Sequence, residues 1–397
     1  MSPTGYLETW LAPLGVAAFR DEFFARRSLY REGGPARLGA LAALRKWDPL
    51  DIITSQRGDV LAWFMATDGR HMTAEIAPGA GAKLYQGGTT IYVKEPPELA
   101  PMRKAIAREL ALPEGNLQCN LFCNQPGART RAHFDPVDTL TVQITGRKRW
   151  RIAPNRHAPD PTLAWATLDR AMRPELRLYA EGPLPDRMPE GEAEDYLLEP
   201  GAVLYVPRGY WHETESDEPS ISLHVHHIPV PWADAVLVAL RAKLLRDPAF
   251  RASAFTLWDP SRRRADEATL AGLLDALGRA ARDLAPDDVL PTPRPRDGAP
   301  GPSERFARRA LTGLLVEPGG DEGGARMVTF SAVEQGNERR TTVEMSASYL
   351  RACRLFAGPT PPALSAHDLA ARVPGLEVDE ALALLSLLLD VGFLRTA

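Results

Sequence analysis

The sequence predicts a chain built around a mainly β domain of the sandwich or barrel type, with helical elements before and after it. Between residues 89 and 230, short segments rich in β-branched and aromatic residues alternate with Gly and Pro turns. On both sides of this stretch, apolar residues recur instead at helical spacing. The 397 residues are too many for one hydrophobic core, so two or three domains are expected.

Composition and charge exclude several classes of protein. Hydrophobic residues make up 44% and charged residues 25% of the chain, as in folded globular proteins. A formal net charge of -4 is not the basic footprint of a nucleic-acid binder. Three cysteines in a chain of this length argue against a disulfide framework and favour a reducing, cytoplasmic location. Without a long apolar run or a signal-peptide pattern, neither membrane insertion nor secretion is expected.

The first 230 residues supply the predicted β domain and its helical cover. Residues 6 to 32 have apolar residues near helical spacing and predict one or two amphipathic helices. A further helix is expected at Leu99–Glu109. The expected strands are Thr89–Val93, Leu117–Cys123, Thr139–Ile144, Arg147–Ile152, Ala202–Val206 and Ile221–Ile228.

After Pro231 the strand pattern stops. Helices are predicted at Trp232–Leu245 and Glu267–Leu284, followed by a Pro-rich linker over residues 285–303. The pattern of residues 304–397 predicts a helix, two strands and three helices, and this order resembles a winged helix. These elements are expected at Glu304–Leu315, Met327–Ser331, Thr341–Met345, Ser346–Phe356, Ala366–Val373 and Val378–Leu389.

A candidate metal site is the most informative motif. On an extended strand, His133 and Asp135 point to the same face, because side chains repeat every two residues. This pair alone is a weak signal, but His212 follows a strand and a turn at Pro207 and Gly209, which would return the chain toward a barrel interior. Two imidazoles and one carboxylate leave one face of an octahedron open, which suits iron(II) binding 2-oxoglutarate and dioxygen.

A cation for the distal carboxylate of 2-oxoglutarate is expected at Lys148. Lys148, Trp150 and Ile152 share one face of a predicted strand, whereas Arg147, Arg149 and Arg151 occupy the other. The two hydrophobic members predict that the Lys148 face is the buried one. A lysine on a buried face requires an anionic partner. The alternative is that Lys148 is one solvated charge in a basic run.

These segments resemble JmjC-domain oxygenases, and within them the ribosomal oxygenases, also described as cupin-4 proteins. The resemblance is carried by Asn120-Leu121-Phe122, Pro126-Gly127, His133-Phe134-Asp135, Asp138, Gln143, Gly146 to Trp150 and Tyr205 to Gly209. It implies a double-stranded β-helix of the jelly-roll or cupin type, with iron(II) bound by His133, Asp135 and His212. Lys148 would then pair with 2-oxoglutarate, and Thr130 would contact it, unless the Thr130 hydroxyl only closes a turn.

The resemblance also implies the domain order. It comprises a JmjC domain with N-terminal helices over residues 1–231, a helical dimerisation module over 232–284, the linker, and a winged-helix domain over 304–397. A homodimer is therefore expected.

Substrate preference is expected to depend on features in which this chain departs from the family. Ser222, His224 and His226 alternate with Ile221, Leu223 and Val225, and either set could face the barrel interior. If the polar set does, His224 would lie near the cosubstrate, and Ser222 and His226 would contact substrate. Asn120 is a further candidate for cosubstrate binding, and Tyr210 and Trp211 for substrate binding, although ordinary packing is the alternative for all three. Residues 154–195 form a long insertion and a candidate lid.

The predicted function is an Fe(II)- and 2-oxoglutarate-dependent oxygenase that hydroxylates a side chain of a protein or peptide. The target could be a ribosomal protein or a ribosomally made precursor peptide of a natural-product pathway. Two other classes remain as alternatives, a nucleic-acid-binding regulator acting through the winged helix and a scaffold without catalysis. Residues 303–397 carry 10 basic and 12 acidic residues, which argues against binding to phosphates.

Overall fold

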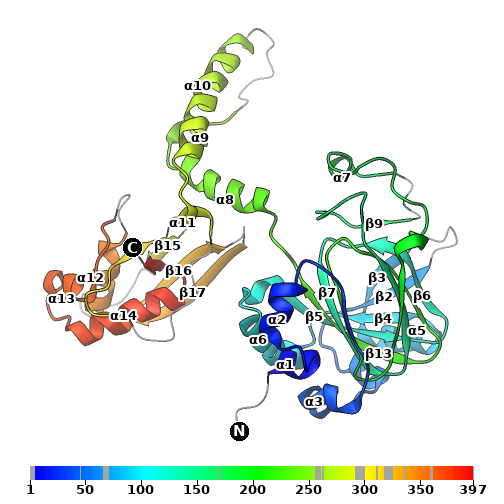
Figure 1. Ribbon diagram of the computed structural model, residues 1–397. Helices are drawn as coiled ribbons and strands as arrows, with labels where there is room; N and C mark the ends of the chain where they lie inside the picture. The colour runs from blue at the N-terminus through cyan, green and yellow to red at the C-terminus, as the bar shows by residue number, and fades with distance from the viewer. Residues whose placement is uncertain are drawn as a thin grey trace. The chain divides into compact units, whose positions relative to one another are not determined.

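The computed structural model divides the chain into two compact units, Met1–Pro229 and Val230–Ala397 (Figure 1). The structure describes residues 5–396 except 45, 66–70, 168, 170, 255–260, 262, 291–299, 310–311, 317–324, 335–336 and 358–360. No helix among these residues is long and apolar enough to cross a membrane.

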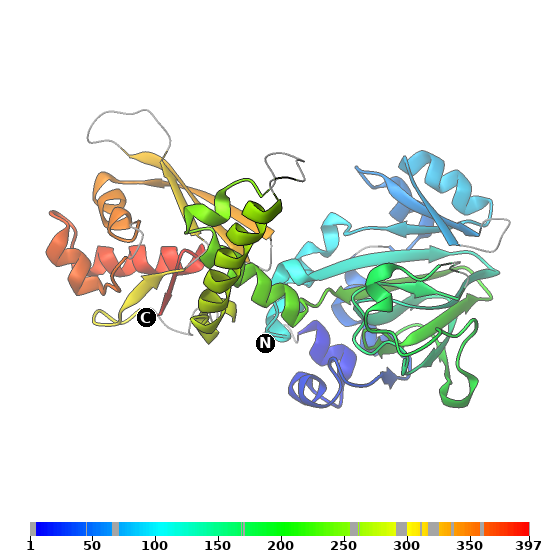
Figure 2. The same ribbon diagram turned by 90° about the horizontal axis from the view of Figure 1, so that it is seen from above.

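The first unit is an antiparallel jelly roll of two sheets. The larger sheet has the strand order β1-β11-β7-β13-β5-β4-β2-β3, and the smaller has β10-β8-β12-β6-β9. The strands of the larger sheet are β1 Leu29–Arg31, β2 Val60–Met65, β3 His71–Ile76, β4 Thr90–Val93, β5 Leu117–Asn124, β7 Asp138–Thr145, β11 Val203–Val206 and β13 Ser220–His227. Those of the smaller are β6 Ala128–Phe134, β8 Lys148–Ala153, β9 Trp165–Ala166, β10 Glu194–Leu198 and β12 Trp211–Ser216. Figure 2 shows the same strands from above. The mainly β fold of this unit is confirmed.

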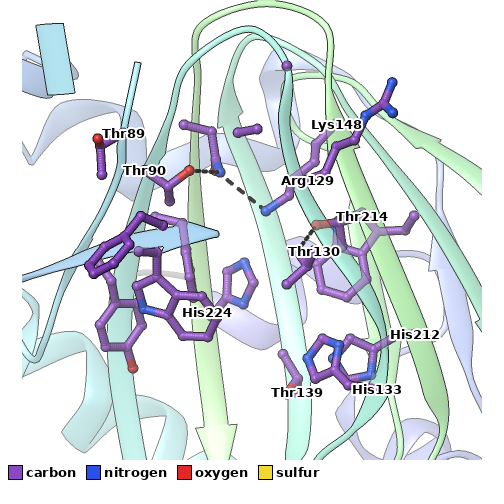
Figure 3. A pocket seen from close by; sticks show the side chains of 18 of the residues that line it. Thr89, Thr90, Arg129, Thr130, His133, Thr139, Lys148, His212, Thr214 and His224 are labelled. Carbon is purple, nitrogen blue, oxygen red and sulfur yellow. Dashed lines mark hydrogen bonds between the residues drawn. The ribbon is translucent and has the colours of Figure 1, made fainter. Parts of the chain in front are cut away.

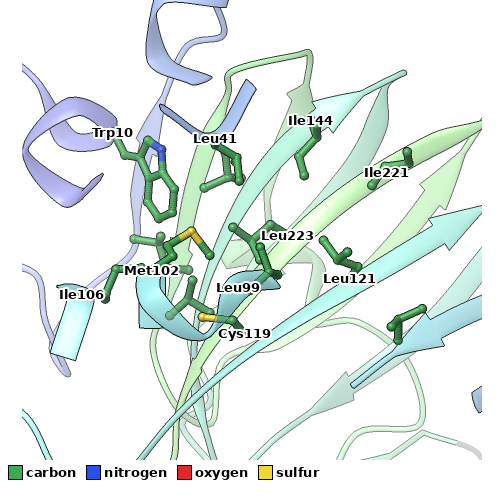
Figure 4. Packing of buried hydrophobic residues seen from close by; sticks show 14 of the residues in the cluster. Trp10, Leu41, Leu99, Met102, Ile106, Cys119, Leu121, Ile144, Ile221 and Leu223 are labelled. Atoms are coloured by element: carbon green, nitrogen blue, oxygen red, sulfur yellow. The ribbon is translucent and has the colours of Figure 1, made fainter. Parts of the chain in front are cut away.

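The two faces of the larger sheet differ in chemistry. On β13, Ile221, Leu223 and Val225 point outward into the main hydrophobic core, where they meet the helices that cover this face (Figure 4). Ser222, His224 and His226 therefore point inward, between the sheets. The open question of which set faces the barrel interior is answered in favour of the polar set.

Helices from the N-terminal half cover the outer face of the larger sheet. They are α1 Tyr6–Leu11, α2 Val16–Glu22, α3 Pro35–Ala43, α4 Pro49–Thr54, α5 Pro78–Gln86 and α6 Ala100–Glu109, with the short 3₁₀ turns η1 Pro97–Leu99 and η2 Glu114–Asn116. The Glu109 carboxylate accepts hydrogen bonds from the first backbone N–H groups of α1, at Tyr6 and Leu7. The prediction of helices throughout residues 6–32 is wrong at its end, because Leu29–Arg31 pairs with β11 as a strand.

The insertion at residues 154–195 folds against the outside of the smaller sheet. It contains β9, α7 Pro174–Arg177, η3 Glu190–Glu192 and the first residues of β10. Leu176 and Met188 pack with Phe134 and Trp211 in a separate hydrophobic cluster. This cluster explains why a segment with few strand signals still has a defined conformation.

The second unit begins with helices α8 Trp232–Leu244, α9 Pro248–Arg251, α10 Arg263–Arg282 and α11 Pro286–Val289. Lys243 of α8 forms an ion pair with Asp288 of α11. The prediction of an extended linker over residues 285–303 is therefore wrong at its start, where α11 forms. Residues 291–299 of that linker lie outside the described residues.

The C-terminal part of the second unit has its own core. Its elements are β14 Phe306–Arg308, β15 Thr312–Val316, β16 Arg326–Glu334, β17 Asn337–Met345, α12 Ala347–Leu355, α13 Ala366–Arg372, α14 Val378–Asp390 and β18 Leu394–Thr396. The predicted helix at Glu304–Leu315 is wrong, because β14 pairs with β18 and β15 pairs with β16 instead. The three later helices are confirmed. Assignment as a winged helix stays a prediction.

Candidate functional site

Three side chains with metal-binding groups meet between the two sheets. His133 is near the end of β6, Asp135 follows that strand, and His212 is the second residue of β12, directly opposite His133 in the ladder. Asp135 Oδ2 lies 3.6 Å from Nε2 of each histidine. The three ligand atoms all lie within 4.8 Å of one another. The structure thus brings together the triad expected from the sequence.

Backbone hydrogen bonds orient both imidazoles. His133 Nδ1 lies 2.8 Å from the carbonyl oxygen of Arg131, and His212 Nδ1 lies 3.0 Å from that of Tyr210. Each Nδ1 therefore carries the proton and donates, which leaves the Nε2 lone pair directed at the centre. This tautomer is the one required for binding a metal through Nε2.

The charge environment suits a divalent cation. Burial alone would raise the pKa of Asp135, but its interactions with His133, and to a lesser extent with His212, hold it well below its usual range. Burial and the neighbouring His133 lower the pKa of His212 to about 4. A carboxylate and a neutral imidazole are the forms that bind metals. Two nitrogen ligands and one oxygen ligand on one side of the centre match the facial arrangement used by non-haem iron(II).

Lys148 is the buried cation expected near the metal ligands. Its side chain is 4% exposed, and Nζ lies 3.4 Å from Oδ1 of Asn124, whose amide donates to Thr90 Oγ1. No carboxylate pairs with it among the described residues, and burial lowers the pKa of Lys148 to about 8. Arg149 of the same strand forms an exposed ion pair with Asp217. The predicted alternation of buried and exposed faces is confirmed.

The triad and Lys148 share one cavity of about 520 Å³ (Figure 3). That volume is sufficient for a small dicarboxylate and one amino-acid side chain. The side chains lining it come from both sheets. They include Trp63, Phe64, Thr89, Thr90, Tyr92, Phe122, Asn124, Thr130, His133, Asp135, Thr139, Lys148, Trp150, His212, Thr214, His224 and His226.

Of the other predicted residues, Thr130, His224 and His226 line the cavity. The Thr130 hydroxyl bonds to that of Thr214, on the neighbouring strand. The His224 ring lies 4.4 Å from Phe122, and its Nε2 is 3.1 Å from Ser222 Oγ. His226 Nδ1 lies 3.0 Å from the hydroxyl of Thr139, on the wall nearest Asp135.

Four predicted residues do not line the cavity. Trp211 points away from it, is fully buried and packs edge-on against Phe134, because its neighbour His212 occupies the inward face of β12. Tyr210 packs in the cluster around Trp150 and Ile152. Ser222 is buried beneath His224. Asn120 accepts a hydrogen bond from the backbone N–H of Glu95.

The insertion at 154–195 contributes no lining side chain among the described residues, so a lid over the cavity is not observed. One wall instead comes from β2, β4 and the residues before β4, including Trp63, Tyr92 and Thr90. Sequence reasoning missed this wall. The Val60–Met65 run has the β-type composition that could have revealed a strand, but its pairing with β4 depends on the fold.

An antiparallel jelly roll holding a His-x-Asp pair and a distant His defines the class of cupin-type metal-binding barrels. Residues 106–234 match the family described as JmjC domain. Within the class, these residues are similar to JmjC domains, and the chain is similar to the ribosomal oxygenases. The resemblance inferred from the motifs is confirmed.

JmjC oxygenases use Fe(II) and 2-oxoglutarate, and the triad supplies the donors that this iron site requires. The prediction of Fe(II) and 2-oxoglutarate as cofactors is confirmed by the family match and by the triad.

Relatives differ in how much of the chain they match. Uncharacterized protein YxbC of Bacillus subtilis is 26% identical over 302 residues, 72% of this chain and 90% of that protein. Ribosomal oxygenase 2 of Rattus norvegicus is 24% identical over 257 residues, 59% of this chain and 50% of that protein. Ribosomal oxygenase 1 of Homo sapiens is 27% identical over 151 residues, 37% of this chain and 21% of that protein. The chain thus spans half or less of these two ribosomal oxygenases.

The X-ray structure of ycfD from E. coli aligns over 96% of this chain and 98% of that chain, with 16% identity and a TM-score of 0.43.

Proposed function

We propose that this protein is an Fe(II)- and 2-oxoglutarate-dependent oxygenase that hydroxylates a side chain of a protein or peptide. The observation that carries the proposal is the combination, in one cavity, of the oriented His133, Asp135 and His212 triad with the buried cation Lys148. Many metal sites have two histidines and a carboxylate. A second, cationic site in the same cavity additionally favours a cosubstrate with two acidic ends.

In this proposal, His133, Asp135 and His212 hold the iron, and the bound iron and 2-oxoglutarate supply the oxidation of a C–H bond. Lys148 binds the distal carboxylate of 2-oxoglutarate, supported by Asn124, which already contacts both Lys148 and Thr90. The aromatic rings of Phe122 and Trp150 flank the Lys148 ammonium group and exclude water from it. Exclusion of water strengthens a contact between opposite charges.

The substrate side chain would occupy the remaining part of the cavity, along Trp63 and Tyr92. Relatives support a protein substrate, because their names describe ribosomal oxygenases and a bifunctional lysine-specific demethylase and histidyl-hydroxylase. We extend that substrate class, a protein or peptide side chain, to this chain. His226 and Thr139, which are bonded to each other on the wall nearest Asp135, are placed to contact ligands near the metal.

The test is turnover measured as succinate release from 2-oxoglutarate in the presence of iron(II) and ascorbate. His133→Ala is expected to abolish release because one of three ligands is lost. The matched control is His367→Ala, which removes an exposed imidazole in the second unit and should leave turnover unchanged. Turnover by His133→Ala at the parent rate would contradict the proposal.

A further inference from the structure

Asp138 is a buried carboxylate that joins three separate segments around the triad. It is 2% exposed and lies at the start of β7, three residues after Asp135. Oδ1 accepts hydrogen bonds from the Tyr205 hydroxyl at 2.9 Å and the Arg208 backbone N–H at 3.0 Å. Oδ2 lies 2.8 Å from Nδ1 of His227, at the end of β13. A carboxylate this buried is stable only with several donors, and this one has three.

Two of these segments carry metal ligands. The turn at residues 207–209 leads directly into His212, and it is tied twice to the Asp135 segment. Arg208 donates to the Asp138 carboxylate, and the Gly209 N–H donates to the carbonyl oxygen of Asp135 at 2.9 Å. The separation between Asp135 and His212 therefore depends on a short backbone link that Asp138 helps to hold.

The donors to Asp138 are themselves held in place. The Tyr205 hydroxyl also accepts a hydrogen bond from the Ala25 N–H at 2.7 Å. The Tyr205 ring packs edge-on against Phe19, with centroids 5.0 Å apart, and is stacked on Phe24. Phe24 also contacts the His227 ring. The N-terminal helices thus restrict the groups that bind the carboxylate.

We propose that Asp138 is a positioning residue: through the 207–209 turn it sets the distance between Asp135 and His212 and so the affinity of the metal site. This inference rests on the proposed function only in that the triad must bind a metal. Asp138 itself does not line the cavity, so it acts through other residues.

The test is titration of the full-length protein with cobalt(II), followed by visible absorption. In Asp138→Asn, an amide NH₂ group replaces one acceptor oxygen, so a donor faces either His227 or Arg208. Cobalt affinity is expected to fall by about 10-fold or more, the size of effect seen when groups that support metal ligands are changed. The absorption spectrum should change as well, because the ligand geometry is altered.

Two control variants separate positioning from general stability. Tyr205→Phe removes the buried hydroxyl but keeps the ring and the bond between Asp138 and Arg208, so it should lower the melting temperature without weakening cobalt binding. Asp160→Asn removes the exposed carboxylate that pairs with the Arg208 side chain and should change neither quantity. A loss of affinity in Tyr205→Phe equal to that in Asp138→Asn would overturn the proposal.

The outcome for the parent protein distinguishes this inference from the proposed function. If the parent protein does not bind cobalt(II) at a site that requires His133, both the proposed function and this inference are overturned. If it does bind cobalt(II) there, but Asp138→Asn binds it equally tightly, only the inference is overturned. Should Asp138→Asn fail to fold, Asp138→Glu replaces it: the longer side chain moves the carboxylate relative to the Arg208 N–H, so weaker cobalt binding is expected, and unchanged binding would overturn the inference.

Discussion

Hydrogen-bond partners decide what each buried histidine of the cavity presents to a ligand. His133 and His212 each use Nδ1 on a backbone carbonyl oxygen two residues earlier, which leaves both Nε2 atoms facing Asp135. In His224, by contrast, Nε2 is bonded to the Ser222 hydroxyl, and burial lowers its pKa well below the usual value. His224 is therefore neutral and contributes an uncharged, polar ring beside Lys148.

Lys148→Ala tests the second half of the site. A charge-assisted contact to a desolvated carboxylate contributes about 1.5–3 kcal/mol, so its loss should raise the KM for 2-oxoglutarate by about 10- to 100-fold. Metal binding should persist, because Lys148 is not a ligand. Steady-state succinate release gives the KM, and a cobalt(II) titration gives the metal affinity.

Arg149→Ala is the matched control for Lys148→Ala. Arg149 is the next residue on β8, but its guanidinium faces solvent beside Asp217, with 62% of the side chain exposed. Its removal should leave the KM for 2-oxoglutarate unchanged. An unchanged KM in Lys148→Ala, or an equal rise in both variants, would place the anion site elsewhere.

At the scale of elements, the turn between β11 and β12 brings His212 to the triad. Gly209 has φ of +82°, a conformation that favours glycine, and an added Cβ would lie 2.5 Å from Cδ of Pro161. The same residue donates its N–H to Asp135. The turn thus depends on the absence of a side chain at this position.

Gly209→Ala is therefore expected to lower the melting temperature and weaken cobalt binding. The left-handed conformation alone costs an alanine about 1–2 kcal/mol, and the contact with Pro161 adds to it. Gly182→Ala is the control, because Gly182 has the same φ of +82° but open space where the Cβ would be. Equal effects of the two substitutions on melting temperature and cobalt affinity would contradict a special role for this turn.

At the scale of the whole molecule, α10 exposes apolar side chains. None of its described side chains is buried, and Leu270 and Leu274, one turn apart, are 53% and 54% exposed. Exposed apolar surface of this kind often marks an interaction site. We propose that α10 contributes to a homodimer, in agreement with the helical dimerisation module expected from the sequence.

Light scattering at micromolar concentration should therefore give the mass of a dimer for the parent and of a monomer for Leu270→Glu combined with Leu274→Glu. Two buried charges at an interface cost far more than the apolar contacts they replace. Leu178→Glu, at an 85% exposed position of the first unit, is the control and should remain dimeric. A monomeric parent would contradict the proposed dimer.

Prediction from the sequence succeeded where a pattern is local. The alternation of Lys148, Trp150 and Ile152 predicted a buried face correctly, because side chains of a strand alternate whatever lies around them. Prediction failed at Leu29–Arg31 and at residues 304–315, where pairing with distant strands overrode a helical pattern. The sequence left open whether Trp211 contacts substrate or only packs, because the orientation of its side chain depends on which face of β12 meets the barrel interior.

The sequence by itself determined which donor groups the candidate site has, since the residue types and the spacing of His133, Asp135, Lys148 and His212 can be seen without the fold. Only the tertiary structure decided that Ser222, His224 and His226 face inward, that β2 and β4 form a wall, and that Asp138 joins three segments. These features require residues far apart in the chain to meet. The physical reason is that burial of the whole hydrophobic core decides which face of each strand points inward and which strands pair with one another.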